Sequence, residues 1–233
     1  AVANEINKLE GQEQLAEQIR GAVFAASKDY SASIAAFRRA YDVAPSKVQP
    51  MVTLVRSYLL AGKAGEAMDF LGSVIQASPD NVTALLLLGE LQAANGDSAE
   101  AVQSFERVID LQPQNTAGYT NLANLRMREG HADAAEQVIG RGLLAVPGNF
   151  DLLMAQASIY EVSRRFEEAI AAYEALFKTY PGSDVVVNNL ASLLSEHRTD
   201  QTSLLRAYEM TQRFSRSDAP YFKDTLGWAN YRL

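Results

Sequence analysis

The feature that most constrains this chain of 233 residues is a proline that returns at a fixed interval of 34 residues. The prolines of this series are Pro45, Pro79, Pro113, Pro147 and Pro181. A constant period of this size is typical of solenoids, in which each unit buries its apolar face only against its neighbours. The spacing therefore predicts an extended array of similar units, which offers a long surface for binding and no reaction chamber.

Two further positions recur at fixed distances before each proline. Twelve residues before it stands a small residue, namely Ser33, Ala67, Ala101, Ala135 and Ala169. Eight residues before it stands a large one, namely Phe37, Leu71, Phe105, Ile139 and Tyr173. Residues four apart share a helical face, so the small residue lets two helices approach while the large one fills the space beside them. The pattern therefore predicts that each unit consists of a helix, a turn and a second helix that ends before the proline.

Glycine stands seventeen residues before the proline in three units, at Gly62, Gly96 and Gly130, whereas Lys28 and Arg164 occupy this position in the other two. A glycine between two helices predicts a left-handed residue that ends the first helix, because glycine adopts this conformation without steric cost.

This pattern resembles the tetratricopeptide repeat, a helix pair of 34 residues. The segments 62–67 and 96–101 look like its inter-helix turn. The resemblance implies an all-α fold, a right-handed superhelical solenoid of helix-turn-helix repeats. We expect repeats at about 14–47, 48–81, 82–115, 116–149, 150–183 and 184–219. Residues 1–13 are interpreted as the tail of a preceding helix and 220–233 as the first helix of a truncated seventh repeat, so the chain is interpreted as a fragment of a longer protein.

The C-terminal part carries a second resemblance. Residues 188–194 (NNLASLL) and 224–228 (DTLGW) look like the ending of bacterial repeat proteins linked to envelope and exopolysaccharide export, among them PEP-CTERM-associated repeat lipoproteins. This resemblance implies a bacterial protein that is periplasmic, or membrane-anchored through a preceding region. A cytoplasmic location remains the alternative.

Composition argues against several function classes. The net charge of −7 disfavours binding to nucleic acid, and the absence of cysteine excludes disulfides and thiolate metal sites. His131 and His197 are far apart in the sequence, and no phosphate-binding loop or nucleophile motif is present. The longest apolar run, 84–89, is too short to span a membrane. We therefore expect no enzymatic activity, no metal, no cofactor and no membrane span.

The resemblance also implies that the first helix of each repeat lines a concave binding face. The residues expected on this face are Thr53, Arg56, Leu86, Glu90, Thr120, Asn121, Asn124, Met127, Met154, Ser158, Asn188, Asn189 and Ser192. Glu161 belongs to the same set of helix positions. Basic residues are missing from the fifth position of these helices, which disfavours the carboxylate clamp of chaperone-binding members of the family.

Two features of this face allow more than one interpretation. Asn121, Asn124, Asn188 and Asn189 would hydrogen-bond the backbone of an extended peptide, or would satisfy neighbouring groups within the array. Val52, Leu86, Met127 and Met154 would accept an amphipathic helix, or would belong to the core.

The sequence thus predicts a non-enzymatic scaffold that binds a protein or peptide partner, in a bacterial envelope or exopolysaccharide assembly. The alternative is a regulatory or substrate-presenting array of a larger enzyme, such as a glycosyltransferase. Self-association through the open ends of the array is a further expectation.

Overall fold

The computed structural model describes residues 12–233, which form thirteen α-helices and one short 3-10 helix without any β-strand. The predicted all-α fold is therefore confirmed. The helix tail expected at residues 1–13 lies almost wholly outside the described residues. The chain divides into two compact units, one ending at Leu111 and the other beginning at Gln112.

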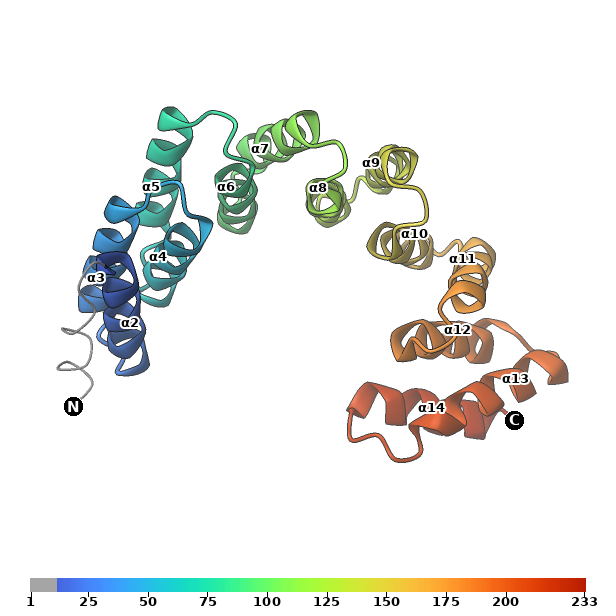
Figure 1. Ribbon diagram of the computed structural model, residues 1–233. Helices are drawn as coiled ribbons and strands as arrows, with labels where there is room; N and C mark the ends of the chain where they lie inside the picture. Colours follow the sequence, from blue (N-terminus) through green and yellow to red (C-terminus); the bar gives the residue numbers. More distant parts are fainter. Residues whose placement is uncertain (1–11) are drawn as a thin grey trace. The chain divides into compact units, whose positions relative to one another are not determined.

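The first unit contains three consecutive helix pairs (Figure 1). Its helices are α2 (Glu13–Ala26), α3 (Tyr30–Val43), α4 (Val48–Leu60), α5 (Ala64–Ala77), α6 (Val82–Asn95) and α7 (Ser98–Leu111). The two helices of each pair are joined by turns of two to three residues and pack against each other.

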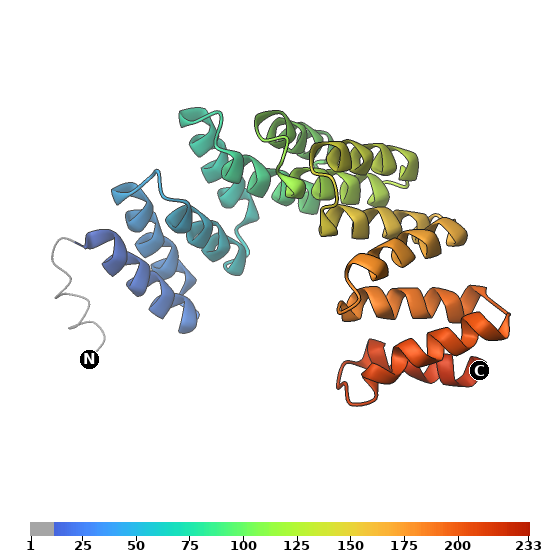
Figure 2. The same ribbon diagram turned by 45° about the vertical axis from the view of Figure 1, so that its right-hand side comes forward.

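The second unit continues the same pairing and ends in a single unpaired helix. Its helices are α8 (Thr116–Arg128), α9 (Ala132–Ala145), α10 (Phe150–Val162), α11 (Phe166–Thr179), α12 (Asp184–His197), α13 (Gln201–Thr211), the 3-10 helix η1 (Gln212–Phe214) and α14 (Pro220–Arg232). Within this unit α8, α10 and α12 lie along one side of the stack and α9, α11 and α13 along the other (Figure 1; Figure 2).

Each of the five regularly spaced prolines stands two residues beyond the end of the second helix of a pair. Pro79, for example, follows α5, which ends at Ala77, and Pro181 follows α11, which ends at Thr179. Proline disfavours helical backbone in the residue before it, so each helix ends just before the proline and the chain turns toward the next pair.

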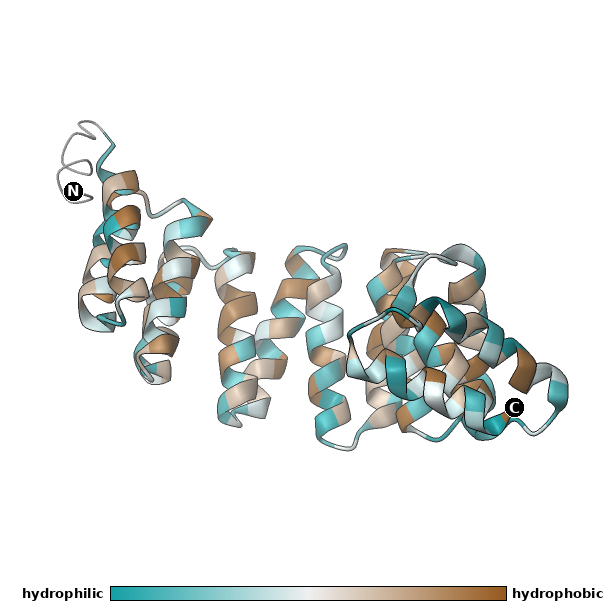
Figure 3. Ribbon diagram, turned by 90° about the horizontal axis from the view of Figure 1, so that it is seen from below, coloured by the Kyte–Doolittle hydropathy of each residue, from teal (hydrophilic) through white to brown (hydrophobic). Residues whose placement is uncertain are grey.

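The recurring small and large residues form the contact inside each pair. Ala101 is fully buried, and a Cβ atom built on Gly89 of α6 would lie 2.7 Å from the ring of Phe105 in α7. Ser33 replaces alanine in the first pair, and its buried hydroxyl donates to the Gly21 carbonyl at 3.0 Å. Apolar and polar residues are mixed along the individual helices (Figure 3).

The inter-helix turn has the same left-handed backbone in the five helix pairs that precede the regularly spaced prolines, with or without glycine. Gly96 has φ +93° and Gly130 has φ +79°, while Arg164 adopts φ +58° at the equivalent position. Gly62 and Lys28 complete the series. The position in the repeat, rather than glycine itself, determines the turn, and the non-glycine residues carry steric strain.

In the second unit, ion pairs connect second helices, or the residues just before them, one repeat apart. Arg165 binds Glu136 of α9 at 2.5 Å, and Arg198 binds Glu167 of α11 through two bonds of 2.6 and 2.7 Å. Arg206 of α13 binds Glu174 of α11 in the same two-pronged manner. The charged segment at the start of α11 therefore joins neighbouring repeats.

Candidate binding groove

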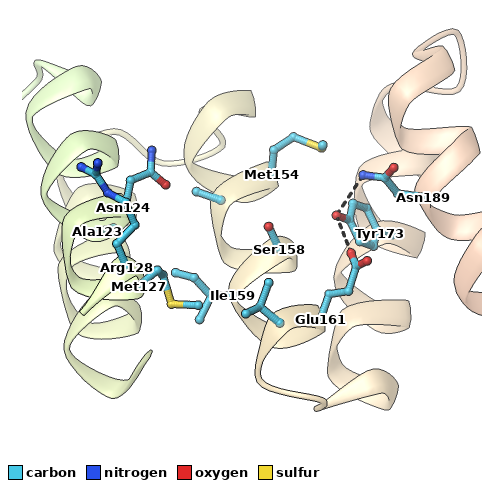
Figure 4. A pocket seen from close by; sticks show the side chains of 12 residues that line it. Ala123, Asn124, Met127, Arg128, Met154, Ser158, Ile159, Glu161, Tyr173 and Asn189 are labelled. Atoms are coloured by element: carbon cyan, nitrogen blue, oxygen red, sulfur yellow. Dashed lines mark hydrogen bonds between the residues drawn. The ribbon is translucent and has the colours of Figure 1, made fainter. Parts of the chain in front are cut away.

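A groove of about 650 Å³ lies in the second unit between the first helices of two consecutive pairs, α8 and α10 (Figure 4). Tyr173 of α11 and Asn189 of α12 close one end of it. The remaining lining residues are Ala123, Asn124, Met127, Arg128, Met154, Ala155, Ser158, Ile159, Glu161 and Val162.

A second hollow of about 440 Å³ extends this groove toward the N-terminal halves of the same two helices. It shares Asn124, Met154 and Ala155 with the first and adds Thr120 and Phe150. The two hollows together follow much of the length of α8 and α10, so they offer a trough for a segment of chain rather than a closed chamber for a small molecule.

Methionine and small apolar side chains form much of the groove wall. Met127 and Met154 are both half-buried, and Met154 also packs against the core that α10, α11 and α12 share. These methionines therefore contribute to the core and to the groove at once. Methionine is flexible and polarizable, which suits a wall that adapts to the shape of an apolar side chain.

A chain of hydrogen bonds forms the polar end of the groove. The amide of Asn189 donates to the hydroxyl of Tyr173 at 3.0 Å, and that hydroxyl donates to the carboxylate of Glu161 at 3.3 Å (Figure 4). Tyr173 is only 1 % exposed, so its ring is fixed by packing while its hydroxyl reaches the groove.

Burial raises the pKa values of two groups in this network. Burial raises the pKa of Glu161 above its ordinary value, and the nearby charge of Glu196 raises it further, while the Tyr173 hydrogen bond and His197 oppose the shift. Burial also raises the pKa of Tyr173 to about 12, and the negative charge of Glu161 adds to this shift. The tyrosine hydroxyl consequently remains protonated at neutral pH and can donate to the carboxylate.

The structure brings together several of the residues predicted for a binding face. The predicted residues that line the two hollows are Thr120, Asn124, Met127, Met154, Ser158 and Asn189, together with Glu161. Three other predicted residues of this unit, Asn121, Asn188 and Ser192, do not line them.

The four asparagines differ in their surroundings. Asn189 is bonded to Tyr173 and accepts from the Asn188 amide at 3.4 Å, and Asn121 is half-buried with a partner in the chain. Asn124 is exposed and lines both hollows. The interpretation in which asparagines satisfy neighbouring groups within the array therefore describes Asn189, while Asn124 is accessible to a ligand.

The four predicted residues of the first unit lie on α4 and α6. Thr53 directs its hydroxyl to the carbonyls of Gln49 and Pro50 in its own helix. Arg56 and Glu90 are exposed, and Leu86 is half-buried. Their place on a binding face stays a prediction.

Tyr173 and Arg128 are polar groove residues that sequence reasoning missed. Tyr173 is the one with a signal in the sequence. It occupies the large position of its repeat, which predicts a core contact, and it does pack in the core. The available signal is that Tyr173 alone carries a hydroxyl, whereas Phe37, Leu71, Phe105 and Ile139 hold this position in the other repeats.

Neither metal ligation nor membrane insertion finds support within residues 12–233. No group of three His, Asp or Glu side chains in this range could hold a metal ion. His131 precedes α9, and His197 ends α12 with its ring stacked on Phe166 at 3.6 Å between ring centres. None of the helices in this range has the length and apolar character needed to cross a bilayer.

The helix pairs, their left-handed turns and the groove between first helices define a tetratricopeptide repeat protein. Residues 71–187, about half of the sequence, match the family described as the cytochrome c-type biogenesis protein H TPR domain. The chain belongs to this family. No curated protein matches the sequence.

Solved structures with the same fold come from several bacteria. PilF of Pseudomonas aeruginosa superposes with a TM-score of 0.63 at 14% identity, covering 93% of this chain and 98% of that one. A tetratricopeptide repeat protein of Parabacteroides merdae gives 0.58 at 14% identity, with 94% and 99% covered. One from Thermus thermophilus gives 0.57 at 20% identity, with 78% and 98% covered. These similarities establish the fold alone.

Proposed function

We propose that this chain is a non-enzymatic scaffold that binds a segment of a partner protein in the groove between α8 and α10. The observation that supports this proposal is the trough itself, which combines a methionine wall with a positioned carboxylate. Tetratricopeptide repeat proteins in general bind proteins or peptides, and the trough matches a peptide in shape better than a compact metabolite.

The ligand segment inserts an apolar side chain between Met127 and Met154, and Asn124 bonds its main chain. An amide donates and accepts at once, so Asn124 reads a peptide backbone without requiring a particular side chain. Asn124 lies where the two hollows meet, so it is placed to contact a segment that runs along both.

A groove-filling variant tests this function. Ser158 is exposed and lines the groove, so Ser158→Trp places an indole in the trough without disturbing the core. Ala171→Trp adds the same side chain to an exposed position of α11 and is the matched control. We expect cross-linked partners from cell extracts to be retained by the wild type and A171W and lost by S158W. Equal capture by all three proteins would contradict the groove as the binding site.

Two cellular roles are candidates for this scaffold. The segments 188–194 and 224–228 lie outside the family match and support a role in a bacterial envelope or exopolysaccharide assembly, with a periplasmic or membrane-anchored location. The family name supports a role in cytochrome c-type biogenesis instead. Mass spectrometry of partners lost with S158W distinguishes the two, and fractionation of the source cells tests the location.

We also propose that α14 mediates self-association. Trp228 is 42% exposed and Tyr231 is 78% exposed, and their rings stack at 5.4 Å between centres. Sedimentation over a range of concentrations should show reversible dimers that Trp228→Ser with Tyr231→Ser weakens. A monomer at all concentrations would contradict this role.

A further inference from the structure

Glu161 is a groove carboxylate that pairs with neither a lysine nor an arginine among the described residues. The carboxylates of the second unit that pair with an arginine are Glu129, Glu136, Glu167, Glu168, Glu174 and Asp184. Within residues 12–233, Glu161 forms no ion pair with a lysine or arginine, and its carboxylate contacts the neutral hydroxyl of Tyr173. His197 of α12 favours the charged form of Glu161, but no lysine or arginine within residues 12–233 pairs with that charge at the groove.

The carboxylate is also held in place before any ligand arrives. Tyr173 is fixed in the core and donates to Glu161, and Asn189 holds the tyrosine hydroxyl from the other side. Ser158, one turn earlier on α10, adds an exposed hydroxyl on the same groove wall. A positioned acceptor binds a cation with little loss of conformational freedom.

Because it is partly desolvated, the Glu161 carboxylate gains more from a cationic partner than a surface carboxylate does. Burial disfavours the charged form of Glu161, so a cation that enters the groove recovers an interaction that water supplies incompletely. Hydrogen bonds between charged partners are stronger than those between neutral groups.

A cation lies on the wall of the groove opposite Glu161. Arg128 is exposed and lines the groove from α8, whereas Glu161 lies near the C-terminal end of α10 beside Tyr173 and Asn189 (Figure 4). Like charges repel, so a basic ligand residue is favoured at the α10 wall beside Glu161 and disfavoured at the α8 wall beside Arg128.

We propose that the groove selects a peptide segment in which a lysine or arginine pairs with Glu161 and a neighbouring apolar side chain packs against Met127 and Met154. This inference rests on the proposed function, since it assumes that the groove binds a peptide. The charge complementarity of Glu161 specifies the chemistry of the occupant: basic and apolar side chains close together in one segment.

Selection from a random 12-residue peptide library on the immobilised protein tests the inference. The wild type is compared with Glu161→Gln, in which the amide oxygen still accepts from Tyr173, with the groove-filled S158W, and with Glu209→Gln as control. Glu209 is an exposed carboxylate of α13, so E209Q removes the same charge outside the groove.

The outcomes separate this inference from the proposed function. Peptides that need the open groove and are enriched in lysine or arginine beside an apolar residue, with the basic enrichment lost in E161Q and kept in E209Q, support the inference. Groove-dependent peptides without that enrichment overturn it and leave the proposed function standing. If S158W selects the same peptides as the wild type, or no protein selects any, both the inference and the proposed function fail.

A selected peptide then allows a quantitative test. Replacing its basic residue by norleucine removes the charge and keeps the aliphatic stem, and we expect about a tenfold rise in Kd on the wild type. On E161Q the same replacement should change Kd by less than about twofold, because the partner charge is already absent. Equal effects of norleucine on both proteins would overturn the pairing with Glu161.

Discussion

The hydroxyl of Tyr173 donates to Glu161 at 3.3 Å, so a tyrosine that fills the core of one helix pair also positions the acidic group of the groove. The same hydroxyl accepts the amide of Asn189 at 3.0 Å. Core packing and the candidate binding site are therefore linked through one side chain.

Tyr173→Phe should lower the free energy of unfolding by about 1–2 kcal/mol, because it removes the donor to Glu161 and leaves the Asn189 amide without its acceptor. Denaturant unfolding measures the change. Tyr231→Phe on the exposed face of α14 is the matched control and should leave stability within about 0.5 kcal/mol of the wild type. A loss for Y173F no larger than that for Y231F would show that the hydroxyl contributes nothing.

Glu161→Gln should change how stability depends on pH. The folded pKa of Glu161 is raised above the ordinary value of 4.5, so the folded protein binds more protons than the unfolded chain above that pH. The stabilising contribution of Glu161 is complete below pH 4.5 and is lost as pH rises through the folded pKa. The stability of E161Q relative to wild type should therefore increase from pH 4 to pH 7.

The groups that face Glu161 are Tyr173 of α11 and Glu196 and His197 of α12, and Arg128 of α8 lines the same groove. These groups are present in both proteins, so the difference between the two unfolding curves isolates Glu161 to first order. A difference that stays constant across this pH range would contradict the raised pKa.

Arg164→Gly should stabilise the protein by about 0.5–1 kcal/mol, because glycine relieves the left-handed strain and costs only part of that gain in chain entropy. The reverse change at the equivalent turn, Gly130→Ala, should destabilise by about 1 kcal/mol. Thermal unfolding of the two variants measures both signs. Destabilisation by R164G would mean that the arginine side chain itself supports the turn.

Ala101→Leu should cost about 1–3 kcal/mol, since Ala101 is completely buried and a larger side chain overpacks the contact between α6 and α7. Ala99→Leu, at an exposed position of the same helix, is the control. An unchanged unfolding midpoint for A101L would show that Ala101 does not form a close contact between α6 and α7.

Asn121→Ala combined with Asn124→Ala should weaken partner binding and leave the helix content measured by circular dichroism unchanged. We attribute the loss to Asn124, which is exposed in the groove, so Asn124→Ala alone should reproduce most of it. Binding of the double variant at wild-type strength would exclude amide recognition at this wall.

The sequence pattern predicted the helix-pair fold because its information is local. Small residues such as Ala101, the large residues that follow them and the prolines each act within one repeat, and the structure confirms the all-α repeat fold. The turn at Arg164 was harder to predict. Its left-handed backbone follows from the repeat geometry and not from the residue type, so a rule based on glycine finds only part of the series.

The site was less predictable because its parts come from different helices. The position within the first helix of each repeat was sufficient to predict that Met127, Met154 and Ser158 line the groove. The bond from Tyr173 to Glu161 depends on how α11 packs against α10, which a pattern of large and small residues does not specify. The pairing of Arg165 with Glu136 likewise depends on the stacking of one repeat on the next.

The ion pairs between repeats have a consequence for how the repeats fold while the chain is being synthesised. Arg165 reaches back 29 residues to Glu136, and Arg198 reaches back 31 residues to Glu167. Contacts of such short sequence separation favour rapid folding, and domains fold from the N-terminal end during synthesis. Each folded helix pair thus offers a surface on which the next pair packs. The arginine of the later repeat forms its ion pair with a glutamate of the repeat that has already folded.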